Sequence, residues 1–359
     1  MSAPTTPTLE SLTGGRLILD EPVLATIAER AKAVDKNEIP ARYGIELLGE
    51  QDLITRDSLL DTARQIREIA RIDLSVAFGL WAHTMVISYL ETAGTAYADQ
   101  LLPTLRSGRR PGVTGMAPAF KEAAGAGSID LTAREVDGGV VIDGKLAWAS
   151  NLADDAVIVT AARTGAGERL LVVIDGDAEG VTLGTPFALL GLNATSSASI
   201  TLDGVTVPDA QILSRDLDGF IAAVRPGFVI MQTSECLGVA EAAIEAAGQR
   251  LKGLNEVLAD DVAAVRERIA ELIATQEDLA RRIDAGEQVT KVSLLELRLG
   301  AAEAAVDAAG LEVRVAGGAG YAQSSPASRR FREAAFIPVQ SPSETQLKWE
   351  LQQARKQEG

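Results

Sequence analysis

The stretch VIDGKLAWASNLADDAVIVTA, residues 141–161, decides the fold, because it contains two β-prone runs on either side of a polar segment. LTAREV and the pair Asp137-Gly138 precede it. Asp-Gly favours the tight turn of a β-hairpin, since these residues tolerate positive φ angles. Further runs rich in Val, Ile and Thr continue the pattern, and they read AVIVTAA, RLLVVID, VTLGTP and ASITLDGVTV. We therefore expect a small β-barrel domain over residues 110–216.

The chain on both sides of this region has helical periodicity. Before it, apolar residues recur every three or four positions in VLATIAERAKAV, LLDTARQIREIARI and SVAFGLWAHTMVISYLETAG. After it, one apolar stripe runs through a highly charged segment, at Val265, Ile269, Leu272, Leu279 and Ile283. The sequence predicts an α+β protein with an N-terminal helical domain (1–109), the β-barrel (110–216) and a C-terminal four-helix bundle (217–359).

Composition excludes several classes of protein. The 359 residues are 47% hydrophobic, with 34 basic against 50 acidic side chains, so nucleic acid and anionic membranes are poor partners. The single cysteine, Cys236, excludes an internal disulfide or a cysteine-rich metal site, and we expect no metal. MSAPTTPTLESLTGG lacks the pattern of a signal peptide, and no run of 18 apolar residues suggests a membrane span. We expect a cytoplasmic protein with a buried thiol.

The segment FIPVQSPSETQLKWEL, residues 336–351, marks the start of the last helix. Ser341 suits the N-cap, Pro342 the first helical position, and Glu344 lies three residues after the cap. This places the neutral side chain of Gln340 on the loop just before the helix.

Three segments together resemble the acyl-CoA dehydrogenase superfamily. They are VIDGKLAWASNLADDAVIVTA, VTVPDAQIL and GGAGYAQSSPASRRFREAAFIP, in the order of that family. The resemblance implies the same succession of helices, β-barrel and helical bundle, and it implies a bound FAD. One segment, GMAPAFKEAAGAGSID, departs from the family's first flavin motif, which contains a Thr-Glu pair. Reduced FMN or FADH2 supplied by a separate flavin reductase is therefore an alternative to tightly bound FAD.

The resemblance also implies positions for cofactor contacts. Ser150 would bond the flavin N5 edge with Asn151 beside it, and Trp148 would pack on the ring system. Ser128 and Arg250 would reach the diphosphate. A glycine run would contact the FAD of a neighbouring subunit in a homotetramer or homodimer. Its glycines are Gly317, Gly318 and Gly320. The alternatives are a core aromatic for Trp148, a solvated charge for Arg250 and a helix terminator for the glycines.

The expected reaction depends on Gln340. The family's dehydrogenases carry a catalytic glutamate there, and an amide cannot accept a proton near neutral pH. A second family position for the base falls near Phe228, so dehydrogenation requires Glu235, Glu241 or another acid to reach the site.

The superfamily also contains flavin monooxygenases, which use reduced flavin and O2. REIARIDLSVAFGLWAHTMVISYL resembles their helix pair, in which a histidine like His83 faces the flavin; the alternative is a core or interface histidine. We expect a monooxygenase acting on a small organic substrate, with His83, Ser150 and Gln340 in the catalytic site. An acyl-CoA dehydrogenase with an atypically placed base and a flavin-free scaffold or partner subunit are the alternatives.

Overall fold

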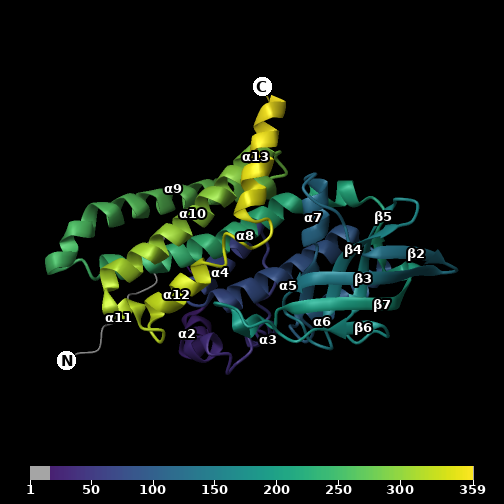
Figure 1. Cartoon of the computed structure of the whole chain (residues 1–359), viewed down its shortest axis with the longest axis horizontal. Helices are drawn as coiled ribbons and strands as arrows, with labels where there is room; N and C mark the ends of the chain where they lie inside the picture. The colour runs from purple at the N-terminus through teal and green to yellow at the C-terminus, as the bar shows by residue number, and fades with distance from the viewer. Residues whose placement is uncertain (1–16, 359) are drawn as a thin grey trace.

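A computed structural model describes residues 17–358, so the segment considered above for a signal peptide lies outside the described residues. The described chain begins with helices that pack against one another and against the sheet (Figure 1). Asp73 caps α5 by accepting the Val76 N–H, and Gly94 ends that helix in the left-handed conformation that glycine tolerates. These helices are α2 (Glu21–Asp35), α3 (Tyr43–Glu50), α4 (Leu59–Ala70), α5 (Leu74–Ala93) and α6 (Ala96–Arg106).

The middle of the chain forms one eight-stranded sheet with strand order β6-β7-β3-β2-β4-β5-β8, and β1 pairs with β4. A short helix, α7 (Ala117–Ala123), follows the first strand, and the turns η1 (Asn193–Thr195) and η2 (Asp209–Gln211) flank β7. The strands are β1 (Gly112–Gly115), β2 (Thr132–Val136), β3 (Gly139–Ala149), β4 (Val157–Thr164), β5 (Arg169–Asp175), β6 (Val181–Leu183), β7 (Ala198–Pro208) and β8 (Ile212–Ser214).

The predicted hairpin is confirmed. Strands β2 and β3 are antiparallel, Val136 pairs with Gly139, and Gly138 between them adopts a φ of 79°. Strand β4 is buried on both faces, which explains its nearly continuous apolar sequence. Ile158 points into a core enclosed by the sheet itself, whereas its neighbour Val159 joins the larger core shared with the helices. The sheet therefore packs against the helical part through apolar side chains.

Helices make up the remainder of the chain. The long α8 packs against α4, α9 and α10, and the apolar stripe predicted for α9 is buried or half-buried against this core. The elements are α8 (Leu217–Gly248), η3 (Gly253–Leu258), α9 (Ala259–Asp284), α10 (Lys291–Ala316), α11 (Gly318–Tyr321), α12 (Pro326–Ala334) and α13 (Glu344–Glu358). This order of helices, sheet and helices is the predicted one.

The start of α13 differs from the prediction. The helix begins at Glu344, and Ser343 rather than Ser341 caps it, because the Ser343 Oγ accepts the Gln346 N–H at 3.3 Å. The Glu344 N–H is instead bonded to the Pro338 carbonyl, which closes the loop that carries Gln340. Two more residues therefore belong to that loop.

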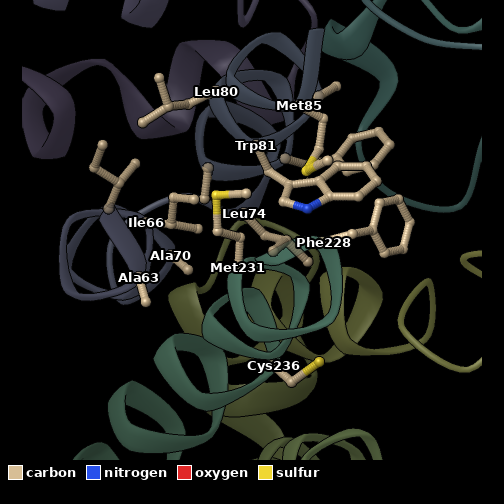
Figure 2. Close-up of a cluster of buried hydrophobic side chains, with 14 of the residues drawn as sticks. Ala63, Ile66, Ala70, Leu74, Leu80, Trp81, Met85, Phe228, Met231 and Cys236 are labelled. Atoms are coloured by element: carbon tan, nitrogen blue, oxygen red, sulfur yellow. The ribbon is translucent and has the colours of Figure 1, made fainter. Parts of the chain in front are cut away.

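Cys236 is buried and unbridged, as expected, and burial raises the pKa of its thiol to about 11. Figure 2 shows its side chain on α8, away from Trp81. Among residues 17–358, no helix has the length and apolar character needed to cross a bilayer.

Candidate functional site

A cavity of about 870 Å³ lies between the sheet and the helices. Its sheet wall comes from the end of β3, the segment before β7 and the loop after α7. Its helical wall comes from α5, α8 and the segment between α12 and α13. Cavities of this size bind cofactors and small molecules, with apolar walls and a few polar groups that orient the ligand. The cavity is therefore the candidate functional site.

Aromatic rings form the inner part of the helical wall. Phe78 stacks on Trp81 with 5.6 Å between ring centroids, and Phe228 of α8 meets the Trp81 ring edge-on at 5.1 Å. Figure 2 shows Trp81 and Phe228 facing each other across the contact between α5 and α8. Phe120 and Phe336 pack against this group. Because the rings are almost completely buried or packed together, this end of the cavity excludes water.

Gln340 is the polar side chain at this wall, and its amide is held in one orientation. The Nε2 group donates to Glu235 Oε2 at 2.6 Å, and Oε1 accepts from Arg298 Nη2 at 3.3 Å. Arg298 is itself completely buried and donates to Gln232 Oε1 at 3.0 Å. Reversing the amide would place its NH2 group against the guanidinium, so the orientation is determined by charge.

Glu235 lies behind Gln340 and does not line the cavity. Burial raises its pKa to about 8, although the Gln340 hydrogen bond and the nearby Arg298 oppose this shift. The carboxyl is therefore mostly protonated near neutral pH. Glu241 is also buried away from the cavity, 3.6 Å from Arg67 and 3.4 Å from Arg71. Among the described residues, Asp130 is the one carboxylate on the lining, and it is exposed to solvent.

The sheet wall carries a chain of hydroxyl groups that the sequence analysis missed. Ser150 Oγ lies 2.7 Å from Ser197 Oγ, which lies 2.7 Å from Thr195 Oγ1. Thr195 in turn donates to the Leu192 carbonyl at 2.8 Å. Ser150 and Ser197 both line the cavity. The run NATSSAS before β7 contains the relevant hydroxyls, but its register against residue 150 is set only by strand pairing.

The structure brings Ser128, Trp148, Ser150 and Gln340 together on the cavity lining. Trp148 is 64% exposed and its ring contacts Phe187, so the alternative of a core aromatic is wrong. These residues come from the β3 end, the loop before β2 and the loop before α13. Their cofactor and substrate contacts stay predictions.

His83 and Asn151 are buried and do not line the cavity. His83 Nδ1 accepts the Gly112 N–H at 2.9 Å, so Nε2 carries the proton and donates to the Leu105 carbonyl at 2.9 Å. Burial lowers the pKa of His83 to about 4, which keeps the ring neutral. The Asn151 amide donates to the Gly79 and Gly112 carbonyls at 2.8 and 3.2 Å. Both side chains join α5 to the sheet, which corresponds to the alternative of a core histidine.

Arg250 and the glycine run also lie off the cavity lining. Arg250 is exposed after the end of α8, and Gly317 ends α10 with a φ of 60°. Figure 1 places α11, which contains Gly318 and Gly320, at the end of the helical part far from the sheet. Any contact of these residues with a cofactor in this cavity would have to come from another copy of the chain.

Comparison with known proteins gives curated relatives that are mostly acyl-CoA dehydrogenases. No family model matches the chain. An acyl-CoA dehydrogenase of Bacillus subtilis is 28% identical over 296 residues, 76% of each chain. Benzylmalonyl-CoA dehydrogenase of Aromatoleum aromaticum is 29% identical over 189 residues, 51% of this chain and 50% of the relative. The chain thus spans about half of the second relative.

Solved structures show the same fold over nearly the whole chain. Glutaryl-coenzyme A dehydrogenase in complex with glutaryl-CoA aligns with a TM-score of 0.83 at 19% identity, covering 98% of this chain and 96% of the other. The curated relatives and the shared fold together place the chain in the acyl-CoA dehydrogenase superfamily. KijD3 in complex with FMN and a dTDP-sugar aligns at 0.79 with 21% identity, covering 98% and 94%. The FAD complex of PigA aligns at 0.80 with 16% identity, covering 95% and 99%.

This acyl-CoA dehydrogenase-like protein is therefore a member of a superfamily of flavin-dependent oxidoreductases. Among residues 17–358, no three His, Cys, Asp or Glu side chains are grouped to hold a metal ion. Its cavity combines an aromatic wall, an amide held in one orientation and a hydroxyl chain, and the buried carboxyl of Glu235 lies behind Gln340 and off the lining.

Proposed function

We propose that this superfamily member is a flavin-dependent monooxygenase that acts with reduced flavin and O2 on a small organic substrate. One observation carries the proposal: the Gln340 amide is bonded to both Arg298 and Glu235. By the family resemblance, Gln340 stands at the position where a dehydrogenase of this family carries its base. The amide cannot take up a proton, and Glu235 is buried behind it in a mostly neutral form.

The residues of the cavity fit a flat cofactor with one polar edge. The volume of about 870 Å³ is sufficient for a large ligand, and Trp148 offers an exposed ring face at the lining. Ser150 and Ser197 provide hydroxyls at one side, and Ser128 lies in the glycine-containing loop before β2. When bound in its reduced form, a flavin supplies the two electrons needed to activate O2. FAD and FMN both remain candidates, and FMN or FADH2 would require a reductase as partner.

The side chains of the helical wall would exclude water and orient the substrate. The rings of Phe78, Trp81 and Phe228 keep the inner cavity apolar, which favours an aromatic or otherwise apolar substrate group. Gln340 keeps one N–H and one lone pair beyond its bonds to Glu235 and Arg298, and these can hydrogen-bond a polar substrate atom. We propose a structural role for His83, since both ring nitrogens are bonded to the backbone.

The proposal predicts how fast the reduced-flavin complex releases hydrogen peroxide when it is mixed with O2. The purified chain is first loaded anaerobically with reduced FMN or reduced FAD and then mixed with buffer containing O2. A monooxygenase slows the release of hydrogen peroxide relative to free reduced flavin, because a dry cavity shields the reactive cofactor. Equal rates of peroxide release with and without the protein, together with reduction of the bound oxidised flavin by an acyl-CoA, would contradict the proposal.

A second candidate function is acyl-CoA dehydrogenation, favoured by the names of the curated relatives and by the contact between Glu235 and Gln340 at 2.6 Å. Anaerobic addition of acyl-CoAs of different chain length to the FAD-loaded protein distinguishes the two. We expect no bleaching of the flavin by the wild-type protein. Gln340→Glu supplies a carboxylate at the cavity lining and should make bleaching detectable. Wild-type bleaching that disappears in Glu235→Gln would identify Glu235 as the base.

The third possibility, a flavin-free scaffold or partner subunit, is tested by binding alone. The chain is titrated with oxidised and reduced FMN and FAD, and the bound fraction is measured by ultrafiltration. We expect binding of at least one form. A chain that binds none of the four would be assigned to the scaffold class. The oligomeric state of the flavin-loaded protein, measured by light scattering, tests the predicted homodimer or homotetramer.

A further inference from the structure

The hydroxyl chain on the sheet wall has one allowed direction. The Leu192 carbonyl can only accept, so Thr195 must donate its single hydroxyl proton to it at 2.8 Å. The contact of 2.7 Å between Thr195 and Ser197 then needs the Ser197 proton. The contact of 2.7 Å between Ser197 and Ser150 in turn needs the Ser150 proton. One backbone carbonyl thus determines the direction of every hydroxyl in the chain.

The direction leaves Ser150 as a hydrogen-bond acceptor. Its proton is directed away from the cavity toward Ser197, so the Ser150 Oγ presents only lone pairs to a ligand. Burial supports this arrangement, because Thr195 and Ser197 are 2% and 6% exposed and have little access to water as an alternative partner. A ligand that meets Ser150 must therefore offer an N–H or O–H group to be bound well.

The loop that carries the terminal acceptor is held rigidly. The side-chain amide of Asn193 accepts the Leu189 N–H at 2.8 Å and donates to the Leu189 carbonyl at 2.9 Å. Leu192 and Ser196 have φ values of 61° and 50°, which non-glycine residues adopt only when their surroundings impose them. The Asn193 side chain and the burial of Leu192 thus hold the backbone that carries the terminal carbonyl of the hydroxyl chain.

We propose that Thr195 and Ser197 are positioning residues that make the site select the reduced flavin over the oxidised flavin. The inference rests on the proposed function and on the contact between Ser150 and the flavin N5 edge that the family resemblance implies. Oxidised flavin has a bare nitrogen acceptor at N5, whereas two-electron reduced flavin has an N–H there. Turning the Ser150 proton toward the cavity would cost its hydrogen bond to Ser197, so the Ser150 oxygen is matched to the reduced form and mismatched to the oxidised one. This preference suits a protein that receives reduced flavin from another enzyme.

The test compares the affinity of both redox forms for the full-length protein. Dissociation constants for oxidised FMN and FAD are measured by fluorescence quenching, and those for the dithionite-reduced forms by anaerobic ultrafiltration. We expect the wild type to bind the reduced form more tightly by about tenfold. Ser197→Ala frees the Ser150 proton to turn toward the cavity, so the ratio of the two constants should fall by about 3- to 10-fold, mainly through tighter binding of the oxidised form.

A second variant and a control complete the test. Thr195→Val allows Ser197 to donate to Ser150, so it should lower the ratio in the same direction and covers the case that Ser197→Ala fails to fold. Ser199→Ala changes a serine on β7 that does not line the cavity, and it should leave the ratio unchanged. An unchanged ratio in both chain variants, or tighter wild-type binding of oxidised flavin, would overturn the inference while leaving the proposed function intact. Failure to bind either form would overturn both.

Discussion

The two walls of the cavity hold their polar groups in different ways. On the sheet wall, Ser150 belongs to a chain of neutral hydroxyls whose direction ends at a backbone carbonyl. On the helical wall, Gln340 is held between a buried guanidinium, Arg298, and a buried carboxyl, Glu235. Each wall therefore presents a neutral group to the cavity in a single orientation, but only the helical wall uses buried charge to do so.

The difference has consequences for stability and for pH. Neutral hydroxyls cost little to bury when each proton has a partner, so the sheet wall should respond weakly to pH and to single substitutions. A buried guanidinium without a close carboxylate partner depends on every acceptor around it, and a buried carboxyl resists ionisation. The helical wall should therefore be the more sensitive of the two, and three measurements test this contrast.

The largest expected change in the free energy of unfolding comes from substituting Arg298 on the helical wall. Its guanidinium donates to Gln232, to Gln340 and to the Ile337 carbonyl. Arg298→Met keeps most of the volume but leaves these acceptors unpaired, and it should lower the free energy of unfolding by about 3–5 kcal/mol, measured by urea denaturation. Arg314→Met on the same helix is the control. That side chain is 61% exposed beside Asp261, so its loss should cost less than about 1 kcal/mol. If Arg298→Met and Arg314→Met lowered the free energy of unfolding equally, the buried guanidinium would have no special role in the helical wall.

The second effect is a pH dependence at Glu235. Its pKa is about 8 in the folded chain against the ordinary 4.5, so the folded state holds a proton that the unfolded state has lost between these values. The free energy of unfolding should therefore fall as pH rises from about 4.5 through 8, and Glu235→Gln should remove this fall. Relative to wild type, the variant should gain about 2–4 kcal/mol between pH 5 and pH 8.5. Parallel profiles would mean that Glu235 is ionised in the fold. Glu303→Gln, at a carboxyl 42% exposed, is the control.

The smallest effect is on the sheet wall. Ser197→Ala removes one donated and one accepted hydrogen bond between neutral groups, and it should lower the free energy of unfolding by about 1–2 kcal/mol at any pH between 5 and 8.5. Ser199→Ala, which removes a half-buried hydroxyl on the same strand, should stay within about 0.5 kcal/mol of wild type. Thermal unfolding followed by circular dichroism measures both. A cost comparable to that of Arg298→Met would contradict the contrast between the walls.

Much of the fold follows from local patterns in the sequence. The Asp137-Gly138 turn and the apolar stripe of α9 were predicted correctly, because turn geometry and helical periodicity depend on neighbours a few residues away. The start of α13 was predicted two residues early. Both Ser341 and Ser343 suit an N-cap, and the hydrogen bond from Glu344 to the Pro338 carbonyl, which no local pattern shows, decides between them.

The candidate site could be predicted only in part. Resemblance to a family pointed to Ser128, Trp148, Ser150 and Gln340, and the fold brings all four to one cavity. The groups that orient these side chains were missed. Ser197 lies 47 residues from Ser150, and Glu235 lies 105 residues from Gln340, so only the pairing of β3 with β7 and the packing of α8 against the loop before α13 reveal them.

By itself, the sequence determined the order of helices and strands, the superfamily and the neutral amide at Gln340, since each of these is written in local composition, spacing or residue identity. Only the tertiary structure decided that His83 is hydrogen-bonded to backbone groups and does not face the cavity. It also decided that Glu235 is buried behind Gln340, and that Ser150 acts as a hydrogen-bond acceptor. The physical reason is that pKa values and the directions of hydrogen bonds depend on burial and on partners brought together from distant parts of the chain.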